Sequence, residues 1–409
     1  MKADLDRLMA ERALDALLIF PGENEDPYRT YLSNGALHSG LVIKRRGEVP
    51  VIIVNSMERD EAARSGLPVR TYDDFGYSEL TRTHKDDRDA VTAAWYRRIF
   101  EEFGVGGKIG VYGVTDINIA LRTLHILGHT FRDALEFVTE QARETVFDRA
   151  YETKDAGELA RLRDVARRTS AVMRAARDWL ATHRAAEGVV VQADGSPLRI
   201  GDVKRHVRGL LYAQGLEDPE GMIFAQGRDA AVPHSKGTDD EPLRLGATIV
   251  FDLFPREPGG YFHDMTRTWC LGYAPPEVQA AYDAVMAAFR RSQEMCAPGL
   301  STSQVQRMVC ELFEAAGHPT VLHTPSTSDG YIHSLAHGVG LNVHEAPYFP
   351  TFSDRYTLQA GNVFTIEPGL YYPERGYGVR IEDTVCLNEA GDLEVLTDCP
   401  YDLVIGLES

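Results

Sequence analysis

The sequence predicts an α+β protein of two domains, a smaller α/β domain over residues 1–150 and a larger mixed domain over 151–409. The 409 residues are about twice the length of a common domain, and the 44% hydrophobic and 25% charged content is typical of a globular protein. Short apolar runs bounded by turn residues fill the first part of the chain. A long helical repeat of apolar residues follows, which places the boundary near residue 150.

In the first domain, the apolar runs LDALLIF, GLVIKRRGEVPVIIV and GKIGVYG predict strands, and the second run holds two strands around a basic turn. The segment YSELTRTHKDDRDAVTAAWYRRIFEEFG predicts a loop followed by a helix. No stretch of this domain has the spacing of a catalytic motif, so we expect the chemistry to lie in the second domain.

In the second domain, residues 159–180 repeat apolar side chains at helical spacing, with arginine and acidic residues on the other faces, which predicts a long amphipathic helix. PPEVQAAYDAVMAAFRRSQEM predicts another helix. STSQVQRMVCELFEAAG predicts a third, with Ser303 and Gln306 in capping-box spacing and an end at Gly317. The segments ATIVFDLF, GGYFHDMTRTW, GNVFTIEPGLYY and YGVRIEDTVCL predict strands around these helices.

The bulk charge and the cysteines exclude several classes of protein. A formal net charge of −18 disfavours a nucleic-acid partner, because phosphate binding needs clustered lysine and arginine. The five cysteines are widely spaced and form no CxxC pair, which favours reduced thiols. The N-terminal stretch carries acidic residues where a secretory signal would be apolar, and no apolar run approaches the roughly 20 residues of a membrane span. We expect a cytoplasmic protein without a membrane partner.

Carboxylates interrupt all four predicted strands of the second domain, at Asp252, Asp264, Glu367 and Glu382. Aspartate is a poor strand former, and burial of a lone charge is costly. A salt bridge or a position at the end of a strand can account for any one of them, and protonation or pairing with arginine or lysine for one or two. A pair of divalent metal ions accommodates all four.

Three histidines, His333, His337 and His344, lie around the glycines of the segment SLAHGVGLNVHEAP. A histidine-rich loop without a ligand would explain this segment alone, but His337 could also supply a fifth ligand beside the four carboxylates. An oxygen-rich set with one imidazole suits Mn²⁺, Co²⁺, Fe²⁺ or Zn²⁺. Two such ions about 3.5–4 Å apart would lower the pKa of a shared water and produce hydroxide near neutral pH, which hydrolyses amides or esters.

The strings DMTRT, HGVGLNVHE, TIEPGLYY and GVRIEDTV resemble the signatures of the pita-bread metallopeptidase family, which includes methionine aminopeptidase, aminopeptidase P, prolidase and creatinase. The resemblance covers about residues 150–409, and the first 150 residues more loosely resemble a creatinase-like N-terminal domain. Methionine aminopeptidases of the common type lack that domain, so the proline-specific branch is favoured. The residues that match the family's metal ligands are all present, namely Asp252, Asp264, His337, Glu367 and Glu382. Their presence disfavours creatinase-type chemistry.

The resemblance implies that these five residues ligate a dinuclear centre, in which Asp264 and Glu382 bridge the two ions. It implies that Glu367 is also the general acid/base. Two departures from the family pattern stand out. The interval from Asp252 to Asp264 is one residue longer than usual, which we assign to the turn. The interval from Glu367 to Glu382 is short, as in compact microbial prolidases.

The resemblance also implies residues that act on the substrate. His344 matches a histidine that contacts the scissile carbonyl or the nitrogen beside it, and His234 matches an upstream histidine that lines the pocket. His333 matches a pocket histidine of the proline-specific enzymes, and Arg380 matches an arginine that pairs with a substrate carboxylate or with the acids of the metal site. His234 and His333 could equally be hydrogen-bonded bystanders. Three other histidines lack motif support and are expected to be structural or at the surface: His263, His318 and His323. Tyr371, Tyr372 and Tyr377 are expected to be packing residues, with the alternative that a tyrosine near Glu367 lines the proline pocket.

The leading hypothesis is a metal-dependent exopeptidase that hydrolyses the Xaa-Pro bond of dipeptides or short peptides through a hydroxide shared by two ions, most readily Mn²⁺ or Co²⁺. The family resemblance implies a homodimer. Two alternatives remain open. One is hydrolysis of a small non-peptide amide such as ectoine on the same fold, and the other is a binding homologue without catalysis.

Overall fold

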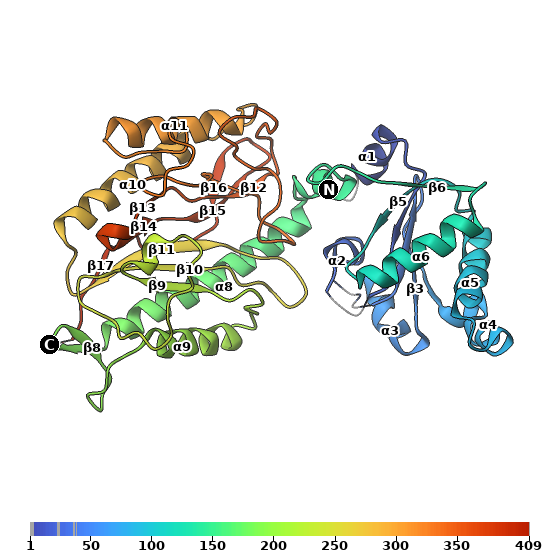
Figure 1. Cartoon of the computed structure of the whole chain (residues 1–409), viewed down its shortest axis with the longest axis horizontal. Coiled ribbons are helices and arrows are strands. Elements are labelled where there is room, and N and C mark those ends of the chain that lie inside the picture. Colours follow the sequence, from blue (N-terminus) through green and yellow to red (C-terminus); the bar gives the residue numbers. More distant parts are fainter. Residues whose placement is uncertain (1–3, 23–24, 36, 38, 409) are drawn as a thin grey trace. The chain divides into compact units, whose positions relative to one another are not determined.

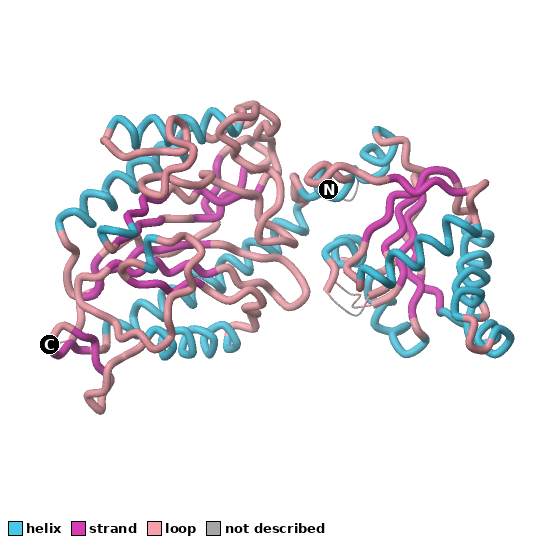
Figure 2. The backbone as a smooth tube through the Cα atoms, in the orientation of Figure 1, coloured by secondary structure: helices cyan, strands magenta, loops and turns pink. Residues whose placement is uncertain are grey.

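The computed structural model describes residues 4–22, 25–35, 37 and 39–408. The chain divides into two compact units, Met1–Tyr151 and Glu152–Ser409. Figure 1 labels the helices and strands of both units, and Figure 2 colours them by type.

The first unit is built on a six-stranded mixed sheet with the order β4-β3-β2-β1-β5-β6. Strand β1 pairs antiparallel with β2 and parallel with β5, so the run ALLI lies at the centre of the sheet and is buried throughout. The strands are β1 Ala16–Ile19, β2 Leu41–Arg45, β3 Val51–Val54, β4 Val69–Thr71, β5 Gly107–Tyr112 and β6 Leu135–Val138. The helices are α1 Leu5–Glu11, α2 Pro27–Ser33, α3 Arg59–Ala62, α4 Tyr77–His84, α5 Arg88–Phe103, α6 Ile117–Thr130 and α7 Val146–Tyr151.

The strand predictions for this unit are confirmed, but the loop predicted before α5 is wrong. Its first eight residues, YSELTRTH, form helix α4. Leu80 of α4 packs in the same apolar cluster as Trp95 of α5. Packing against a neighbouring helix therefore overrides the polar composition that predicted a loop.

In the second unit, strands lie between two pairs of helices (Figure 2). Helices α8 and α9 pack on the four-stranded sheet β17-β11-β10-β9, and α10 and α11 pack on β12 to β15. The helices are α8 Ala156–Ala181, α9 Ile200–Ala213, α10 Pro276–Met295 and α11 Thr302–Ala315. The strands are β7 Arg184–Ala186, β8 Val189–Val191, β9 Ile223–Gln226, β10 Thr248–Leu253, β11 Met265–Leu271, β12 Val363–Ile366, β13 Gly369–Tyr372, β14 Tyr377–Arg380, β15 Asp383–Leu387, β16 Leu393–Val395 and β17 Val404–Ile405.

The three predicted helices of this unit are confirmed, whereas the predicted capping box of α11 is wrong. Ser301 is the N-cap, and Ser303 lies inside the first turn. The Gln306 side chain faces the segment before the histidine motif, where its Oε1 accepts the backbone N–H of Leu335 at 2.6 Å. Helix α11 therefore anchors the chain just before His337.

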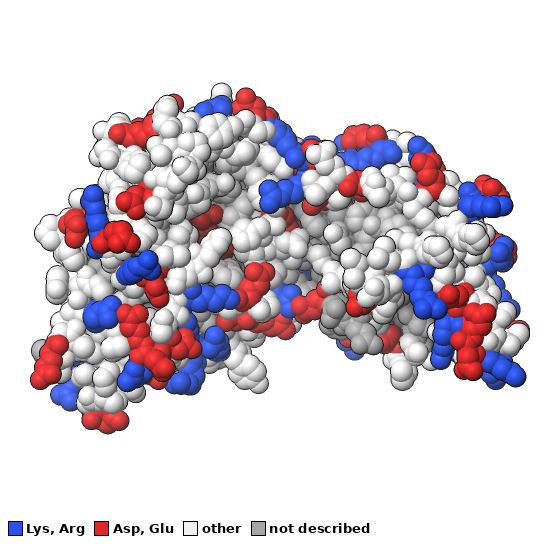
Figure 3. All heavy atoms as spheres, viewed as in Figure 1, with Lys and Arg blue, Asp and Glu red and all other residues white. Residues whose placement is uncertain are grey.

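Charged side chains of both signs are interspersed over the face drawn in Figure 3, and no continuous basic patch covers that face. In the described part of the chain, no helix is both long enough and apolar enough to span a bilayer. All five cysteines are buried and free.

Candidate metal centre

Strands β10 and β11 bring the first two candidate ligands into one region. They pair antiparallel, and Asp252 stands opposite Thr266 while Leu253 stands opposite Met265. Asp264 directly precedes β11, so both carboxylates project from the same end of this pair. The expectation of four carboxylates inside strands is corrected here. Only Asp252 lies within a strand, and the others flank strand ends, where the backbone is free to aim a side chain inward.

Glu382 lies between β14 and β15 and is held by β11. Its backbone exchanges two hydrogen bonds with Thr266, at 3.1 and 3.3 Å between nitrogen and oxygen. The Thr266 hydroxyl donates to the Glu382 carboxylate at 2.7 Å. The side chains of Arg380 and Glu382 both contact this same hydroxyl, with the Arg380 Nε at 3.1 Å.

His337 and Glu367 meet beside strand β12. The backbone N–H of Thr365 donates to the His337 carbonyl at 2.8 Å, and the backbone N–H of Glu367 donates to the Leu335 carbonyl at 2.8 Å. The His337 Nδ1 donates to the Gly338 carbonyl at 3.1 Å. Because a neutral imidazole has one N–H, this bond leaves the lone pair on Nε2. That nitrogen lies 3.3 Å from a Glu367 oxygen.

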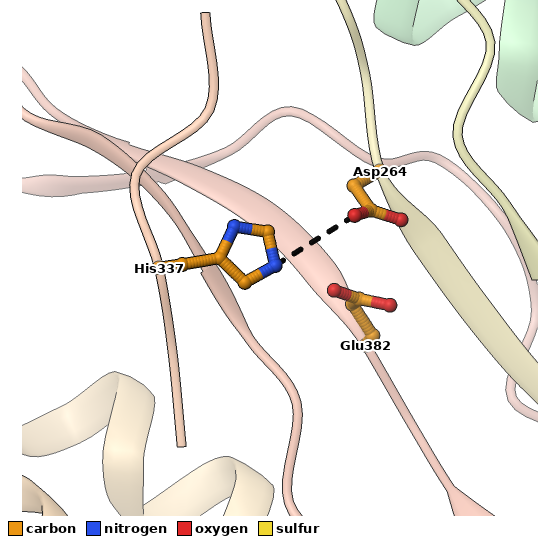
Figure 4. Close-up of side chains that lie close together, drawn as sticks. All are labelled: Asp264, His337 and Glu382. Carbon is orange, nitrogen blue, oxygen red and sulfur yellow. Dashed lines mark ion pairs between the residues drawn. The ribbon is translucent and has the colours of Figure 1, made fainter. Parts of the chain in front are cut away.

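Three of the candidate ligands converge closely enough to hold one ion. Asp264, His337 and Glu382 each offer a ligand atom within 4.8 Å of the others, and all three side chains are buried. Figure 4 shows them pointing toward a common centre, with His337 Nε2 and the Asp264 carboxylate 3.8 Å apart. Asp252 lies against Asp264, and Glu367 lies against His337. All five residues that the sequence predicted as ligands are therefore neighbours.

Burial and mutual repulsion perturb the acidity of this cluster. Burial raises the pKa of Asp264 and of Glu382 well above their ordinary values, and neighbouring carboxylates raise both further. Burial raises the pKa of Glu367 to about 8, against the opposing effect of Arg380. Burial lowers the pKa of His337 to about 3, so this imidazole is neutral at pH 7. A cation is the natural partner of such a set.

Buried carboxylate oxygens without hydrogen-bond partners also indicate that these residues could hold a metal ion. Among the described residues, the Oδ1 atoms of Asp252 and Asp264 are buried without a hydrogen-bond partner. Buried carboxylate oxygens are normally paired, and the lone pair of His337 Nε2 faces further acceptors. Oxygen ligands with one neutral imidazole are the set that suits divalent ions such as Mn²⁺, Co²⁺, Fe²⁺ or Zn²⁺.

Arg380 is committed to the interior of the site. Its Nη2 pairs with the second Asp252 oxygen at 2.7 Å, and its Nη1 donates to the Tyr371 hydroxyl at 2.9 Å. The Nδ1 of His333 donates to the Ser334 carbonyl at 2.7 Å, so Nε2 accepts the Tyr371 O–H at 2.9 Å. Burial lowers the pKa of His333 to about 4, which keeps this imidazole neutral. Arg380 thus orients Asp252, an acid of the cluster. Its described contacts leave few N–H groups that could bind a substrate carboxylate.

His344 and His234 lie on the accessible side of the site. Both side chains are exposed. The rings of His344 and His337 have centroids 4.3 Å apart, which puts His344 next to the cluster. Partial burial lowers the pKa of His344, and the charge of His234 contributes to the lowering. An exposed, neutral imidazole beside the cluster can donate a hydrogen bond to a bound molecule.

The two glycines of the HGVG motif are needed for room rather than for an unusual backbone conformation. A Cβ on Gly338 would stand 2.2 Å from the Ala346 carbonyl oxygen, and one on Gly340 would stand 2.2 Å from a Glu345 carboxylate oxygen. The glycines permit close packing of the loop on the segment that follows it.

The residues without motif support have structural contacts. His263 is buried with its Nε2 3.3 Å from the Thr397 hydroxyl, His318 contacts the Tyr372 hydroxyl, and the exposed His323 contacts Glu314. Tyr371 is the exception among the tyrosines, because its hydroxyl joins Arg380 to His333. Sequence reasoning missed this role and that of Thr266. A threonine in a strand that is buried on both faces requires a polar partner, which was the available signal.

Comparison with known proteins identifies the family. The model of Metallopeptidase family M24 matches residues 160–389. The chain belongs to this family. Two curated relatives are each similar over about half of this chain. The protein named "Probable dipeptidase PepE" of Mycobacterium tuberculosis is 33% identical over 204 residues, 50% of this chain and 51% of the relative. The Xaa-Pro dipeptidase of Pyrococcus furiosus is 35% identical over 191 residues, 46% of this chain and 51% of the relative. The match thus spans about half the length of these relatives.

Solved structures of similar shape extend over both units. The prolidase from Pyrococcus furiosus has a TM-score of 0.72 at 24% identity, covering 97% of this chain and 99% of its own. The Xaa-Pro dipeptidase from Bacillus anthracis has a TM-score of 0.75 at 21% identity, covering 98% and 99%. These likenesses confirm the predicted α+β, pita-bread fold of an M24 protein.

Proposed function

We propose that this protein is a metal-dependent exopeptidase that hydrolyses the Xaa-Pro bond of dipeptides or short peptides. The observation that carries the proposal is the cluster of Asp252, Asp264, His337, Glu367 and Glu382, with unpaired buried oxygens on two of its acids. Membership of family M24 supports peptide hydrolysis. The names of the relatives from Pyrococcus furiosus support the bond before proline.

The five residues are proposed as ligands of two divalent ions, with Asp264 and Glu382 shared between them. Bound ions of this kind supply Lewis-acid activation of a water molecule. Mn²⁺ or Co²⁺ is the proposed identity, with Zn²⁺ or Fe²⁺ as alternatives, because the set offers carboxylates and a single imidazole. Arg380 is proposed to hold Asp252 in its ligating orientation through the 2.7 Å contact.

Glu367 is the proposed general acid/base. Its side chain is 16% exposed, more than those of Asp264 and His337 at 5% and 9%. It can therefore exchange a proton with water and with the leaving proline nitrogen. A pKa of about 8 lies close to neutral pH, where an acid/base group is most effective. A bound cation would lower this pKa and favour the carboxylate that accepts the proton.

His344 is proposed to donate a hydrogen bond to the scissile carbonyl as negative charge develops on its oxygen. His234 and His333 are proposed to line the pocket around the proline ring. His333 is fixed for this role by its bonds to Ser334 and Tyr371.

Three further features belong to this proposal. The first unit is proposed as a creatinase-like N-terminal domain over residues 1–150, with the catalytic domain over 151–409. The protein is proposed to act as a homodimer in the cytoplasm. The spread of both charge signs over the face in Figure 3 supports a peptide rather than a nucleic-acid partner.

The test is proline release from Ala-Pro by protein stripped with a chelator and then reconstituted with Mn²⁺ or Co²⁺. We expect release only after metal is restored, and none from Ala-Ala. Asp264→Asn is the matched variant, which should bind less metal and lose release in parallel. A folded protein that binds two ions per chain but releases no proline from Ala-Pro or from Ala-Pro-Ala would contradict the proposal and favour a small-amide substrate.

A further inference from the structure

The beginning of helix α8 carries charged side chains that contact the two loops leading into the metal cluster. Lys154 and Glu158 are buried, 4% and 6% exposed. Lys154 directly precedes the N-cap Asp155, and Glu158 lies in the first turn of the helix. Their partners are Glu345, directly after His344, and Tyr261, three residues before Asp264.

The carboxylate of Glu345 is the internal anchor of the loop 338–345. It is ion-paired with Lys154 Nζ. Both side chains are almost fully buried, with 4% of the Glu345 side chain and 1% of the Lys154 side chain exposed. Its second oxygen accepts the backbone N–H of Asn342 at 3.3 Å. The carboxylate lies over Gly340, the position where a Cβ would collide with it. In the described structure Lys154 is the cation against this carboxylate, and removing one partner of a buried pair leaves a costly unpaired charge.

The anchored loop sets the spacing of two histidines. Gly338 and Glu345 exchange both backbone hydrogen bonds, at 2.8 and 2.9 Å. His337 directly precedes Gly338, and His344 directly precedes Glu345. The paired residues therefore fix where the two imidazoles stand, with ring centroids 4.3 Å apart.

The second loop is tied to the first and to the same helix start. The Tyr261 hydroxyl donates to Glu158 at 2.8 Å, and the backbone N–H of Phe262 donates to the Gly340 carbonyl at 2.8 Å. The approach to Asp264 and the loop between the histidines are thus held by one buried polar network.

We propose that Lys154 is a positioning residue, whose ion pair with Glu345 fixes His344 relative to the metal cluster. The proposal rests on the proposed function of His344 as a donor to the scissile carbonyl. A displacement of about 1 Å at a catalytic group can cost on the order of 100-fold in rate. Loss of Lys154 therefore lowers kcat, while the number of bound ions stays the same because the backbone bonds that hold the proposed ligands do not involve the Lys154 side chain.

The experiment compares Lys154→Met with Lys44→Met in the full chain. Lys44 is a matched control, because it is also buried and ion-paired, with Asp6 of the first unit. For Lys154→Met we expect kcat on an Xaa-Pro substrate to fall about 10- to 100-fold per metal-loaded, folded molecule. The KM and the metal content should change little, as expected for a group used in the transition state. Lys44→Met should leave kcat unchanged.

Hydrogen exchange gives a readout that does not depend on activity. In Lys154→Met, amides of residues 338–345 should exchange at least tenfold faster, while those of β10 and β11 stay protected. If Lys154→Met does not fold, the double variant Lys154→Met with Glu345→Gln removes both buried charges, and the same two measurements apply to it. A kcat within twofold of wild type, or unchanged exchange over 338–345, overturns the proposal. Failure of the wild type to cleave any Xaa-Pro peptide overturns the proposed function instead, and the exchange result still stands.

Discussion

At the scale of single residues, Glu367 differs from the other acids of the cluster. Its side chain is 16% exposed and so keeps contact with solvent. Asp264 and Glu382 are more deeply buried, which suits residues that hold an ion permanently. The degree of exposure thus suits some carboxylates of the cluster to holding an ion and Glu367 to proton transfer.

Glu367→Gln should lower kcat by about 10²- to 10⁴-fold, because the amide cannot take up and return a proton. Steady-state kinetics with metal analysis measure this effect. Glu394→Gln, which alters an acid paired with Arg163 near the surface, is the control and should keep full activity. An activity of Glu367→Gln within tenfold of wild type would remove Glu367 from the proposed acid/base role.

Tyr371→Phe tests the hydroxyl that joins Arg380 to His333. The variant keeps the ring but leaves an Arg380 N–H and the His333 Nε2 without this partner. The free energy of unfolding should fall by about 1–3 kcal/mol, the cost of an unsatisfied buried polar group. Denaturant titration measures it, with the exposed Tyr273→Phe as control. Equal stability of the two variants would show that the bonds of Tyr371 contribute nothing.

At the scale of elements, the site depends on strand ends that meet rather than on any one strand. Paired strands β10 and β11 deliver two acids, and Thr266 of β11 binds the segment that carries Glu382. The segment 337–345 is hydrogen-bonded to β12 and folds back on itself through the backbone bonds between Gly338 and Glu345. Each proposed ligand is therefore positioned by paired backbone on at least one side, which would hold the cluster in place without an ion.

Gly340→Ala should weaken the protein, because the added methyl group displaces the Glu345 carboxylate from its position. Overpacking of this kind typically costs about 1–3 kcal/mol. Gly209→Ala is the matched control, since it lies within helix α9 with open space around it. That change should stabilise the helix by about 0.5–1 kcal/mol. Thermal unfolding compares them, and a Gly340→Ala protein as stable as Gly209→Ala would contradict the packing described.

The elements could largely be predicted from the sequence, because apolar periodicity is a local signal. The proposed ligands stood out as four acids in apolar runs and one histidine of a glycine-rich motif, and the structure places these five residues as neighbours. What could not be predicted are contacts between distant segments. Arg380 was expected to pair either with a substrate carboxylate or with the acids of the metal site, and only the structure shows its partner to be Asp252, 128 positions away. Lys154 and Glu345 are 191 positions apart and carry no local signal of pairing.

At the scale of the whole molecule, the cluster makes stability depend on pH when metal is removed. The folded-state pKa of Glu367 is raised to about 8, and those of Asp264 and Glu382 are raised too. A carboxyl group whose pKa is higher in the folded than in the unfolded protein stabilises the fold at pH values below its pKa in the unfolded protein. This stabilisation is lost as the pH rises toward its pKa in the folded protein. His333 and His337 have lowered pKa values in the folded protein, so their effect on the stability of the fold has the opposite sign. Their contribution is present above about pH 6.5 and is lost only as the pH falls below that value.

Protein stripped of metal should therefore lose stability as pH rises from about 6.5 to 8, by about 1.4 kcal/mol per pH unit from Glu367 alone. Protein loaded with metal should not, because its ligands are ionised throughout. Thermal unfolding at several pH values, with chelator or with Mn²⁺, measures the difference. The same pH slope for both forms would contradict a cation site at these carboxylates.

The sheet that carries Asp252 has a consequence for how the protein matures. Strand β11 is bordered by β17, where Cys270 and Leu271 pair with Val404 and Ile405. The last proposed ligand, Glu382, precedes that strand in the chain. Because synthesis runs from the N-terminus, a nascent chain carries Asp252 and Asp264 before it carries Glu382 and β17. A truncated copy that ends before Glu382 would therefore hold only part of the proposed metal cluster, and under the proposed function it should not hydrolyse peptides.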